Sequence, residues 1–318
     1  VKMVYNIKYF LIKLNLILKF KSLLITKIFH DIKVALIYKI RNFYSKKLND
    51  RLFILASKID SKVNKNNLEI TIVSNNLDKF TEESKELNQK VSLFISRELR
   101  SRAINGYIKK GILFSGKRLA KNYSLEKIIF HESDIVIDCG ANLGGLWIYL
   151  NLLNIPIKYI CVEPGSFEFR GISKTINYQK NSKIHSYLIN KALSYQNGKT
   201  NFFYSEEADS SLIEYEGYSK KYIVDTITLD SLIKELALQN KKLKLLKLEA
   251  EGAEPEVIKG GMDVIKNIEY IAADLGPERG FNQEITLKEV ANILLQNNFE
   301  IIDIIYPRLC VLFKNKNL

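Results

Sequence analysis

A short apolar run, a glycine turn and a second apolar run form the feature of this sequence that most constrains its fold. Residues 134–145 read Asp-Ile-Val-Ile-Asp-Cys-Gly-Ala-Asn-Leu-Gly-Gly, and Leu-Trp-Ile-Tyr follows at once. The first run predicts a buried strand over 134–138, and the second predicts the start of a helix. Glycines permit unusual backbone angles, and a helix N-terminus presents free N–H groups. A strand, a turn and a helix in this order predict a cradle for a nucleotide or nucleoside.

Patterns of strand and helix alternate through the rest of the chain. Strands are expected over 157–162, 183–189, 222–229, 243–248 and 268–275, and helices over 166–179, 232–238, 255–259 and 286–297. Asn197-Gly198 predicts a hairpin turn between 191–195 and 200–204. Two closing strands, 300–305 and 309–313, predict an antiparallel edge. The alternation as a whole predicts a doubly wound, Rossmann-like α/β sheet.

The first third of the chain has a different character. Residues 1–60 mix large apolar residues with regularly placed lysines, and we expect a basic, apolar helical segment there. Residues 61–109 are interpreted as a linker and a helical region, with 78–108 mostly helical because Leu87, Val91 and Phe94 fit one helix face. Residues 110–318 then form the main, cofactor-binding domain.

The positive charge is concentrated in the N-terminal segment. The net charge is +13, of which residues 1–60 carry +10 and the remainder only +3. A nearly balanced main domain gives no reason to expect nucleic-acid binding. In residues 1–60 lysines interrupt every apolar run well before the roughly 18 residues of a membrane span. The segment is expected either to pack on the main domain or a second copy, or to lie on a membrane surface.

The cysteines indicate the compartment. Cys139, Cys161 and Cys310 are too widely spaced for a disulfide framework or a zinc pattern. A reducing, cytoplasmic setting is therefore expected, with contact to the inner face of the membrane if residues 1–60 bind lipid. No metal site is expected.

Small and acidic residues stand where the strands of the predicted sheet end. In open α/β sheets ligands bind beyond the carboxyl ends of the strands. Asp138 ends the first strand, before the turn that contains Gly140, Asn142 and Gly144. Glu163 ends the second strand, where a carboxylate can accept two hydrogen bonds from a ribose diol. These five residues are the candidate cofactor-binding residues.

The turn differs from the dinucleotide fingerprint. Gly140 and Gly144 are four residues apart, and Asn142 occupies the position where a second glycine would admit a pyrophosphate. A ligand without a diphosphate therefore fits better than NAD. S-adenosylmethionine, with a ribose, an adenine and an amino-acid tail, is such a ligand.

Three motifs resemble one known family. Residues 136–144, the Val-Glu-Pro at 162–164, and the run Leu-Leu-Lys-Leu-Glu-Ala-Glu-Gly-Ala-Glu-Pro-Glu-Val-Ile-Lys-Gly at 245–260 are similar to the motifs of FkbM-type S-adenosylmethionine-dependent methyltransferases. The resemblance covers roughly residues 110–318. It implies a class I methyltransferase sheet whose last strand inserts antiparallel. It also implies methyl transfer to hydroxyl oxygens, often on sugars of glycans or glycosylated metabolites. The chain departs from the family pattern at Glu249, where the family usually has Asp.

Transfer of a methyl group to a hydroxyl calls for a group that removes the hydroxyl proton. Glu249 and Glu251 follow the strand over 243–248, and Asp274 lies near the end of the strand over 268–275. These three acids are the candidate catalytic residues. Substrate selection is expected from residues 205–221 and 276–283. Two alternatives are a non-catalytic partner subunit anchored by the basic N-terminus, and an NAD-dependent oxidoreductase.

Overall fold

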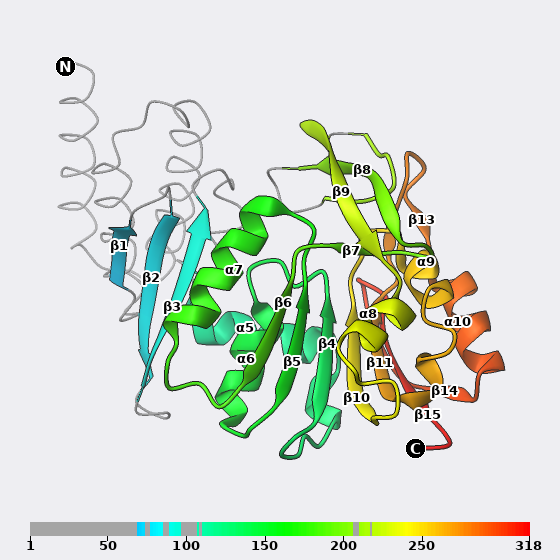
Figure 1. Ribbon diagram of the computed structural model, residues 1–318, viewed down its shortest axis with the longest axis horizontal. Coiled ribbons are helices and arrows are strands. Elements are labelled where there is room, and N and C mark those ends of the chain that lie inside the picture. The colour runs from blue at the N-terminus through cyan, green and yellow to red at the C-terminus, as the bar shows by residue number, and fades with distance from the viewer. Residues whose placement is uncertain are drawn as a thin grey trace, which may run out of the picture.

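The computed structural model describes residues 69–73, 77–84, 89–96, 107, 110–205, 210–216 and 218–318. The expectations for residues 1–60 lie outside this range. A seven-stranded sheet forms its centre (Figure 1). Its strands are β4 (Ile135–Cys139), β5 (Lys158–Val162), β6 (His185–Ile189), β10 (Leu243–Leu248), β11 (Ile268–Asp274), β14 (Phe299–Ile305) and β15 (Cys310–Asn315).

The strand order of the large sheet is β14-β15-β11-β10-β4-β5-β6. Neighbouring strands from β11 to β6 pair in parallel. The last strand, β15, is inserted antiparallel between β11 and β14. The predicted doubly wound sheet with an antiparallel closing strand is therefore confirmed.

Helices cover both faces of the large sheet (Figure 1). One face packs against α5 (Ile112–Asn122), α6 (Gly145–Leu153) and α7 (Ser166–Tyr178), and the other against α8 (Leu229–Glu235), α9 (Glu254–Lys259) and α10 (Leu287–Gln296). Side chains alternate along β4, so that Ile135 and Ile137 join one core and Val136 joins the other. Asp138 therefore lies on the same face as Val136. Short 3-10 helices at Leu125–Lys127 and Ile265–Asn267 complete the helical layers.

A smaller sheet corrects the predicted hairpin at Asn197-Gly198. Its strands β7 (Ala192–Leu193), β8 (Gly198–Tyr204) and β9 (Lys220–Ile227) lie in the order β7-β9-β8, so β7 and β8 do not pair. The Asn197 side chain accepts a hydrogen bond from Thr228 N at 2.8 Å and donates one to Ser231 Oγ at 2.9 Å. These contacts tie the turn to the start of α8 and leave β9 as the partner of both strands. A separate hairpin is formed by β12 (Pro277–Arg279) and β13 (Glu284–Ile285).

The helix expected over 78–108 is wrong, because two of its described parts are strands. β1 (Glu69–Val73), β2 (Leu77–Ser84) and β3 (Gln89–Ser96) form an antiparallel sheet. Val91, Leu93 and Ile95 are buried in the same core, and their spacing of two is that of a strand. The apolar residues of this stretch fit both periods, and packing on the main domain selects the strand.

The small N-terminal sheet lies against α7 (Figure 1). Phe94 N donates to Thr175 Oγ1 of α7 at 2.8 Å. A Cβ added at Gly171 would lie 2.7 Å from Phe94 O, so the helix and β3 are in direct backbone contact. Glu82 of β2 accepts hydrogen bonds from Ile112 N and Leu113 N at the start of α5. The family resemblance begins near residue 110, but β2 and β3 before it pack directly on α5 and α7 after it.

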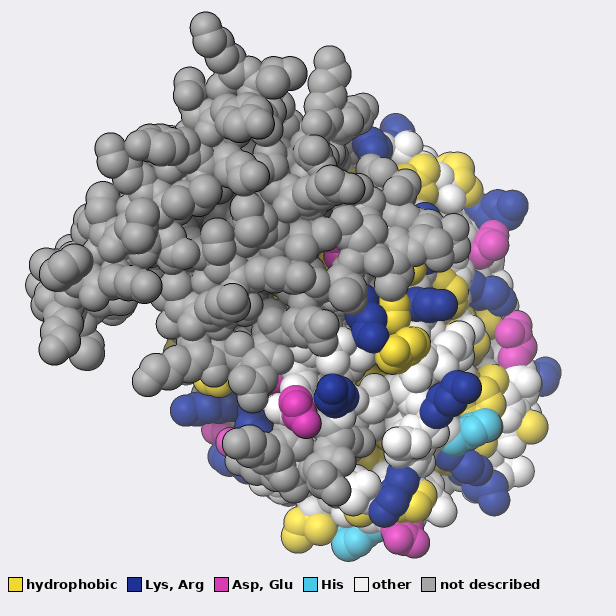
Figure 2. Space-filling view, turned by 90° about the vertical axis from the view of Figure 1, so that its left-hand side faces the viewer, with side chains coloured by type: hydrophobic (Ala, Val, Ile, Leu, Met, Phe, Trp, Pro, Cys, Tyr) yellow, Lys and Arg dark blue, Asp and Glu magenta, His cyan; other side chains and the backbone are white. Residues whose placement is uncertain are grey.

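On the face drawn in Figure 2, the side chains of the described residues show no segregation of charge. In the view of Figure 2, Lys and Arg side chains lie scattered among uncharged ones, with Asp and Glu between them. Within the described residues, no helix is both long and apolar enough to cross a membrane.

Gly171→Ala tests the contact between β3 and α7. We expect the free energy of unfolding to fall by about 1–3 kcal/mol, because the new methyl group overlaps the Phe94 carbonyl. Urea denaturation measures the change. Asn177→Ala, on the exposed face of the same helix, is the control and should change stability little. Equal stability of Gly171→Ala and the wild type would contradict this packing.

Candidate active site

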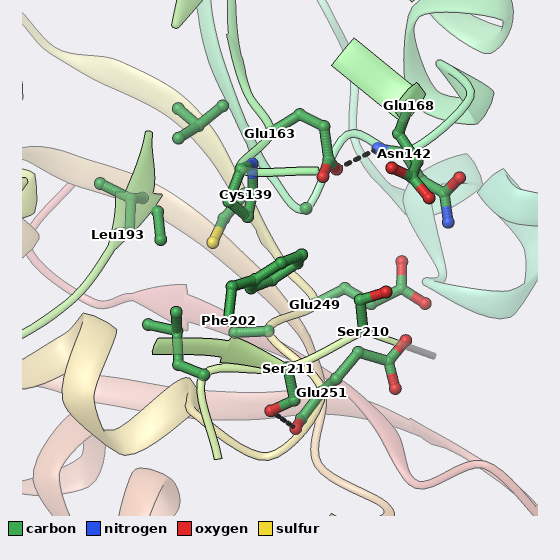
Figure 3. Close-up of a pocket in the computed structure, with 16 residues that line it drawn as sticks. Cys139, Asn142, Glu163, Glu168, Leu193, Phe202, Ser210, Ser211, Glu249 and Glu251 are labelled. Carbon is green, nitrogen blue, oxygen red and sulfur yellow. Dashed lines mark hydrogen bonds between the residues drawn. The ribbon is translucent and has the colours of Figure 1, made fainter. Parts of the chain in front are cut away.

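A cavity lies at the carboxyl ends of β4, β5 and β10, and its volume is about 620 Å³ including the part that is open to solvent. Its wall comes from the turn after β4, the end of β5, the start of α7, β7, β8 and the segments 210–212 and 249–251. Figure 3 shows Glu163, Asn142 and Glu168 on one side and Glu249 and Glu251 on the other.

The turn after β4 brings the backbone of two strands into contact. Gly140 has φ 71°, and a Cβ there would lie 2.0 Å from Glu249 O, so this position requires glycine. Asn142 also has a left-handed φ of 49°, and its side-chain oxygen is buried without a hydrogen-bond partner. Gly144 is the N-cap of α6 and lies against Ile172, outside the cavity wall. The turn thus contributes to the cavity wall a residue whose side-chain acceptor has no hydrogen-bond partner.

Two buried carboxyl groups form one end of the cavity. Glu163 accepts hydrogen bonds from Asn142 N and Gly165 N, each at 2.7 Å. Glu168, in the first turn of α7, has a buried Oε2 with no hydrogen-bond partner. Burial raises the pKa of Glu163 to about 8, with a further contribution from Glu168, and burial raises the pKa of Glu168 to about 7. The two groups therefore hold a proton near neutral pH and offer both a donor and acceptors to a diol.

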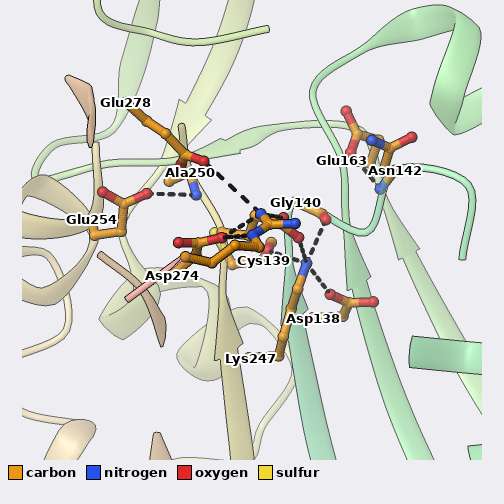
Figure 4. Close-up of polar contacts among 12 residues, drawn as sticks. Asp138, Cys139, Gly140, Asn142, Glu163, Lys247, Ala250, Glu254, Asp274 and Glu278 are labelled. Atoms are coloured by element: carbon orange, nitrogen blue, oxygen red, sulfur yellow. Dashed lines mark hydrogen bonds and ion pairs between the residues drawn. The ribbon is translucent and has the colours of Figure 1, made fainter. Parts of the chain in front are cut away.

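Asp138 lies behind the cavity wall. Its side chain is fully buried, accepts a hydrogen bond from Tyr159 Oη at 2.5 Å and lies 3.2 Å from Lys247 Nζ. Lys247 also donates to Gly140 O at 2.7 Å (Figure 4), and it pairs with Glu249 at 2.8 Å. Burial alone would lower the pKa of Lys247, but the carboxylates of Asp138 and Glu249 raise it overall. Asp138 thus acts on the site through Lys247.

The acids after β10 and β11 are linked by Arg308, in the turn between β14 and β15. Arg308 Nη2 lies 2.9 Å from Glu249 Oε1, and Arg308 Nε donates to Asp274 Oδ2 at 2.8 Å. Burial would raise the pKa of Glu249, but Lys247 and Arg308 lower it to about 2. Burial raises the pKa of Asp274, although Arg308 opposes it. Glu249 is therefore a fixed carboxylate and a weak proton acceptor.

The structure brings some of the predicted residues together and separates others. Gly140, Asn142, Glu163, Glu249 and Glu251 line the cavity. Glu251 has φ 49°, and its carbonyl accepts a hydrogen bond from Ser211 Oγ at 2.6 Å. The members of the predicted set that lie outside the wall are Asp138, Gly144 and Asp274.

Sequence reasoning missed Lys247, Arg308 and Glu168. Lys247 could have been found, because it interrupts an apolar strand immediately before Glu249, where a lysine needs buried partners. Arg308 and Glu168 carry no such local signal, because distant segments bring them to the site. Among the described residues, no group of three His, Cys, Asp or Glu side chains is placed to hold a metal ion.

The wall suits a nucleoside with an amino-acid tail. Its apolar part could hold a purine, and comes from Val162, Leu193, Phe202 and Leu212. The carboxyl pair of Glu163 and Glu168 suits a ribose diol, and Asn142 leaves an acceptor unused. The strand order, with its last strand inserted antiparallel, is that of the class I methyltransferase fold.

The comparisons with known proteins identify the family. The model of the methyltransferase FkbM domain matches residues 138–301, just over half of the chain. The protein belongs to the FkbM methyltransferase family, and its cofactor is S-adenosylmethionine. A comparison with curated protein sequences gave no match.

Solved structures give looser likenesses. The chain is similar to a T. thermophilus 16S rRNA N2 methyltransferase in complex with AdoMet and guanosine, with 11% identity, a TM-score of 0.40, and coverage of 78% of this chain and 53% of that one. A Streptococcus agalactiae protein of the NADB-Rossmann superfamily gives 15% identity and a TM-score of 0.38, and the match covers 63% of this chain and 68% of that one. A Pyrococcus abyssi tRNA (uracil-54, C5)-methyltransferase in complex with S-adenosyl-L-homocysteine gives 9% identity and a TM-score of 0.36, and the match covers 70% of this chain and 41% of that one. The assignment rests on the family match and the strand order.

Lys247→Met tests the buried cation beneath the turn. We expect a loss of about 3–5 kcal/mol in the free energy of unfolding, because Asp138 loses its buried ionic partner. Lys242→Met is the matched control: Lys242 pairs with Glu269 at 3.0 Å but is 51% exposed, so at most about 1 kcal/mol is expected. Urea denaturation at neutral pH measures both, and equal effects would contradict the role assigned to Lys247.

Glu168→Gln tests the carboxyl pair through pH. The raised pKa values mean that the folded state keeps a proton that the unfolded state releases, so the pair's contribution to stability is lost as pH rises from about 4.5 to about 8. Removing one carboxyl should therefore raise the free energy of unfolding by about 1–3 kcal/mol at pH ~8 and change it little at pH ~5. Glu235→Gln, on the surface, should show no such pH dependence. A pH-independent effect of Glu168→Gln would count against a shared proton.

Proposed function

We propose that this protein is an S-adenosylmethionine-dependent O-methyltransferase that acts on a hydroxyl of a sugar, in a glycan or a glycosylated metabolite. The observation that carries the proposal is the concentration of carboxyl groups at one end of the cofactor cavity. Glu249 and Glu251 lie in the wall there, and Asp274 lies just behind Glu249 across Arg308. Carboxyl groups can accept hydrogen bonds and a proton from a hydroxyl acceptor.

The same acids argue against a nucleic-acid acceptor. Binding of a phosphate backbone depends on Lys and Arg side chains. Here two cations, Lys247 and Arg308, pair with the wall residue Glu249, and they are also paired with Asp138 and Asp274. A neutral polyol fits this environment better than a polyanion.

The chain's own residues divide the work of binding and positioning. S-adenosylmethionine supplies an electrophilic methyl group when it is bound. Glu163, Glu168 and Asn142 would hold its polar groups, and Lys247 and Arg308 fix the carboxylate of Glu249 at the opposite end of the cavity. Because the pKa of Glu249 is about 2, we assign it to positioning the ligand. Glu251, also in the wall, is placed to accept a hydrogen bond from a bound ligand.

Transfer of labelled methyl groups tests the function. The purified protein is incubated with S-adenosylmethionine carrying a tritiated methyl group and with cell extract, and the products are separated into saccharide, nucleic acid and protein. We expect label in the saccharide fraction, on an O-methyl sugar after acid hydrolysis, and suppression by excess S-adenosylhomocysteine. Label that is confined to nucleic acid or protein would refute the sugar acceptor.

A further inference from the structure

A second cavity opens beside the cofactor cavity. It measures about 790 Å³ up to its mouth and is lined by Tyr215 and Glu216 on one side and by Glu278 and residues 280–283 on the other. The second side is the β12–β13 hairpin, which follows β11. Both sides lie within the two sequence segments that are expected to select the substrate, and the structure brings them together around one cavity.

One segment joins the two cavities. Ser210, Ser211 and Leu212 line the cofactor cavity, and Tyr215 and Glu216 line the second one a few residues later. The hairpin approaches the same segment, because a Cβ at Gly280 would lie 3.8 Å from Ile213 Cγ2 and from Glu214 O. A molecule in the second cavity would therefore lie next to the cofactor cavity.

The wall of the second cavity combines an exposed aromatic ring with amides and carboxyl groups. Phe281 is 66% exposed, although it is a large apolar side chain. Asn282 and Gln283 stand next to it, and Glu216 lies on the opposite side. The apolar face of a sugar ring packs on an aromatic ring, while amide and carboxyl groups bond its hydroxyls. The wall has the chemistry of a carbohydrate site.

Glu278 differs from the other acids around it. Its neighbour Arg279 forms a bidentate pair with Glu256 at 2.7 and 2.9 Å. Because successive side chains of a strand point to opposite faces, Glu278 points to the face of β12 opposite to Arg279. Glu278 Oε1 lies 3.9 Å from Arg308 Nη2, and its Oε2 is buried with no hydrogen-bond partner. Glu249 and Asp274 are held by Arg308 at much closer range.

The charges that face Glu278 set its protonation. Burial raises the pKa of Glu278, and Asp274, Glu249 and Glu254 raise it further against the opposing effect of Arg308, to about 8. The Glu254 carboxylate accepts hydrogen bonds from Ala250 N, Gly252 N and Thr286 Oγ1. The pKa of Glu249 is lowered to about 2 while that of Glu278 is raised, so Glu278 is the better proton acceptor of the two.

We propose that the second cavity is the acceptor subsite, that it binds a carbohydrate ring against Phe281, and that Glu278 removes the proton of the hydroxyl that is methylated. This inference rests on the proposed function. In the step, the acceptor O–H bond breaks and its proton moves to a Glu278 oxygen. A bond forms between the acceptor oxygen and the methyl carbon, and the carbon–sulfur bond breaks with its electron pair left on sulfur. The sulfonium charge and the Glu278 charge disappear together.

Glu278→Gln tests the proton transfer with a side chain of the same shape. We expect kcat to fall by about 10²–10⁴-fold on whichever acceptor takes the label. The affinity for S-adenosylhomocysteine, measured by calorimetry, should stay unchanged. In the wild type the rate should rise with pH through about 8, as Glu278 loses its proton, and the variant should lack that rise.

Phe281→Ala tests the acceptor subsite separately from the chemistry. Saturation-transfer NMR with the methyl glycosides of glucose, galactose, mannose and rhamnose, in the presence of S-adenosylhomocysteine, should show binding to the wild type and its loss in the variant. Phe114→Ala, which removes another exposed phenylalanine on α5, is the matched control and should bind as the wild type does.

The outcomes separate this inference from the proposed function. If saccharide is methylated but Glu278→Gln keeps the wild-type rate and pH profile, or Phe281→Ala keeps glycoside binding, the inference fails while the function stands. If the label enters another class of molecule, the carbohydrate assignment falls with the proposed function. The effect of Glu278→Gln on that acceptor then decides the role of Glu278. Absence of any glycoside binding to the wild type would overturn the carbohydrate subsite.

Discussion

The ion pair between Asp138 and Lys247 supports the organisation of the whole site. The two residues are directly opposite each other on the parallel strands β4 and β10, and both are almost fully buried. A buried charge is costly unless it is paired and hydrogen-bonded. Here one ammonium group meets Asp138, Glu249 and the carbonyls of Cys139 and Gly140. The same contact that neutralises the charges fixes the glycine turn against the end of β10. The geometry of the cofactor cavity therefore depends on an interaction that lies behind its wall.

Beyond this pair the site consists of acids that outnumber their cationic partners. Lys247 and Arg308 hold Asp138, Glu249 and Asp274 as close ion pairs. The carboxyl groups with less support are Glu163 and Glu168 at one end and Glu278 at the other, and burial raises the pKa of each. Desolvation and like-charge repulsion thus leave protonatable groups at the two places where a diol and a hydroxyl acceptor are proposed to bind.

The large sheet could be predicted from the sequence because its strands are short runs rich in apolar residues, and because β4, β5, β10 and β11 each end at or next to an acidic residue. The run over 243–248 corresponds to β10, and the closing strands and the positions of Glu163 and Glu249 also followed from local patterns. The errors arose where a local signal competed with a distant partner. Val91 and Phe94 fit a helix face as well as a strand, and the strand is selected by pairing with β2 and by contact with Thr175 and Gly171 of α7. Asn197-Gly198 reads as a hairpin turn, yet β9 separates the two strands. Arg308 and Glu278 reach the site through tertiary folding, so no pattern near Glu249 could reveal them.

Helix α7 contributes to the cofactor cavity and also contacts the N-terminal sheet. Its first turn carries Glu168 into the cofactor cavity, and its later turns receive β3 through Gly171 and Thr175. A helix of 13 residues is about 20 Å long and moves largely as a rigid body. A displacement of β3 that shifts α7 would therefore also shift one of the two carboxyl groups at the proposed ribose end. The sheet of β1, β2 and β3, although it lies outside the family resemblance, thus contacts the helix that carries a carboxyl group of the cofactor cavity.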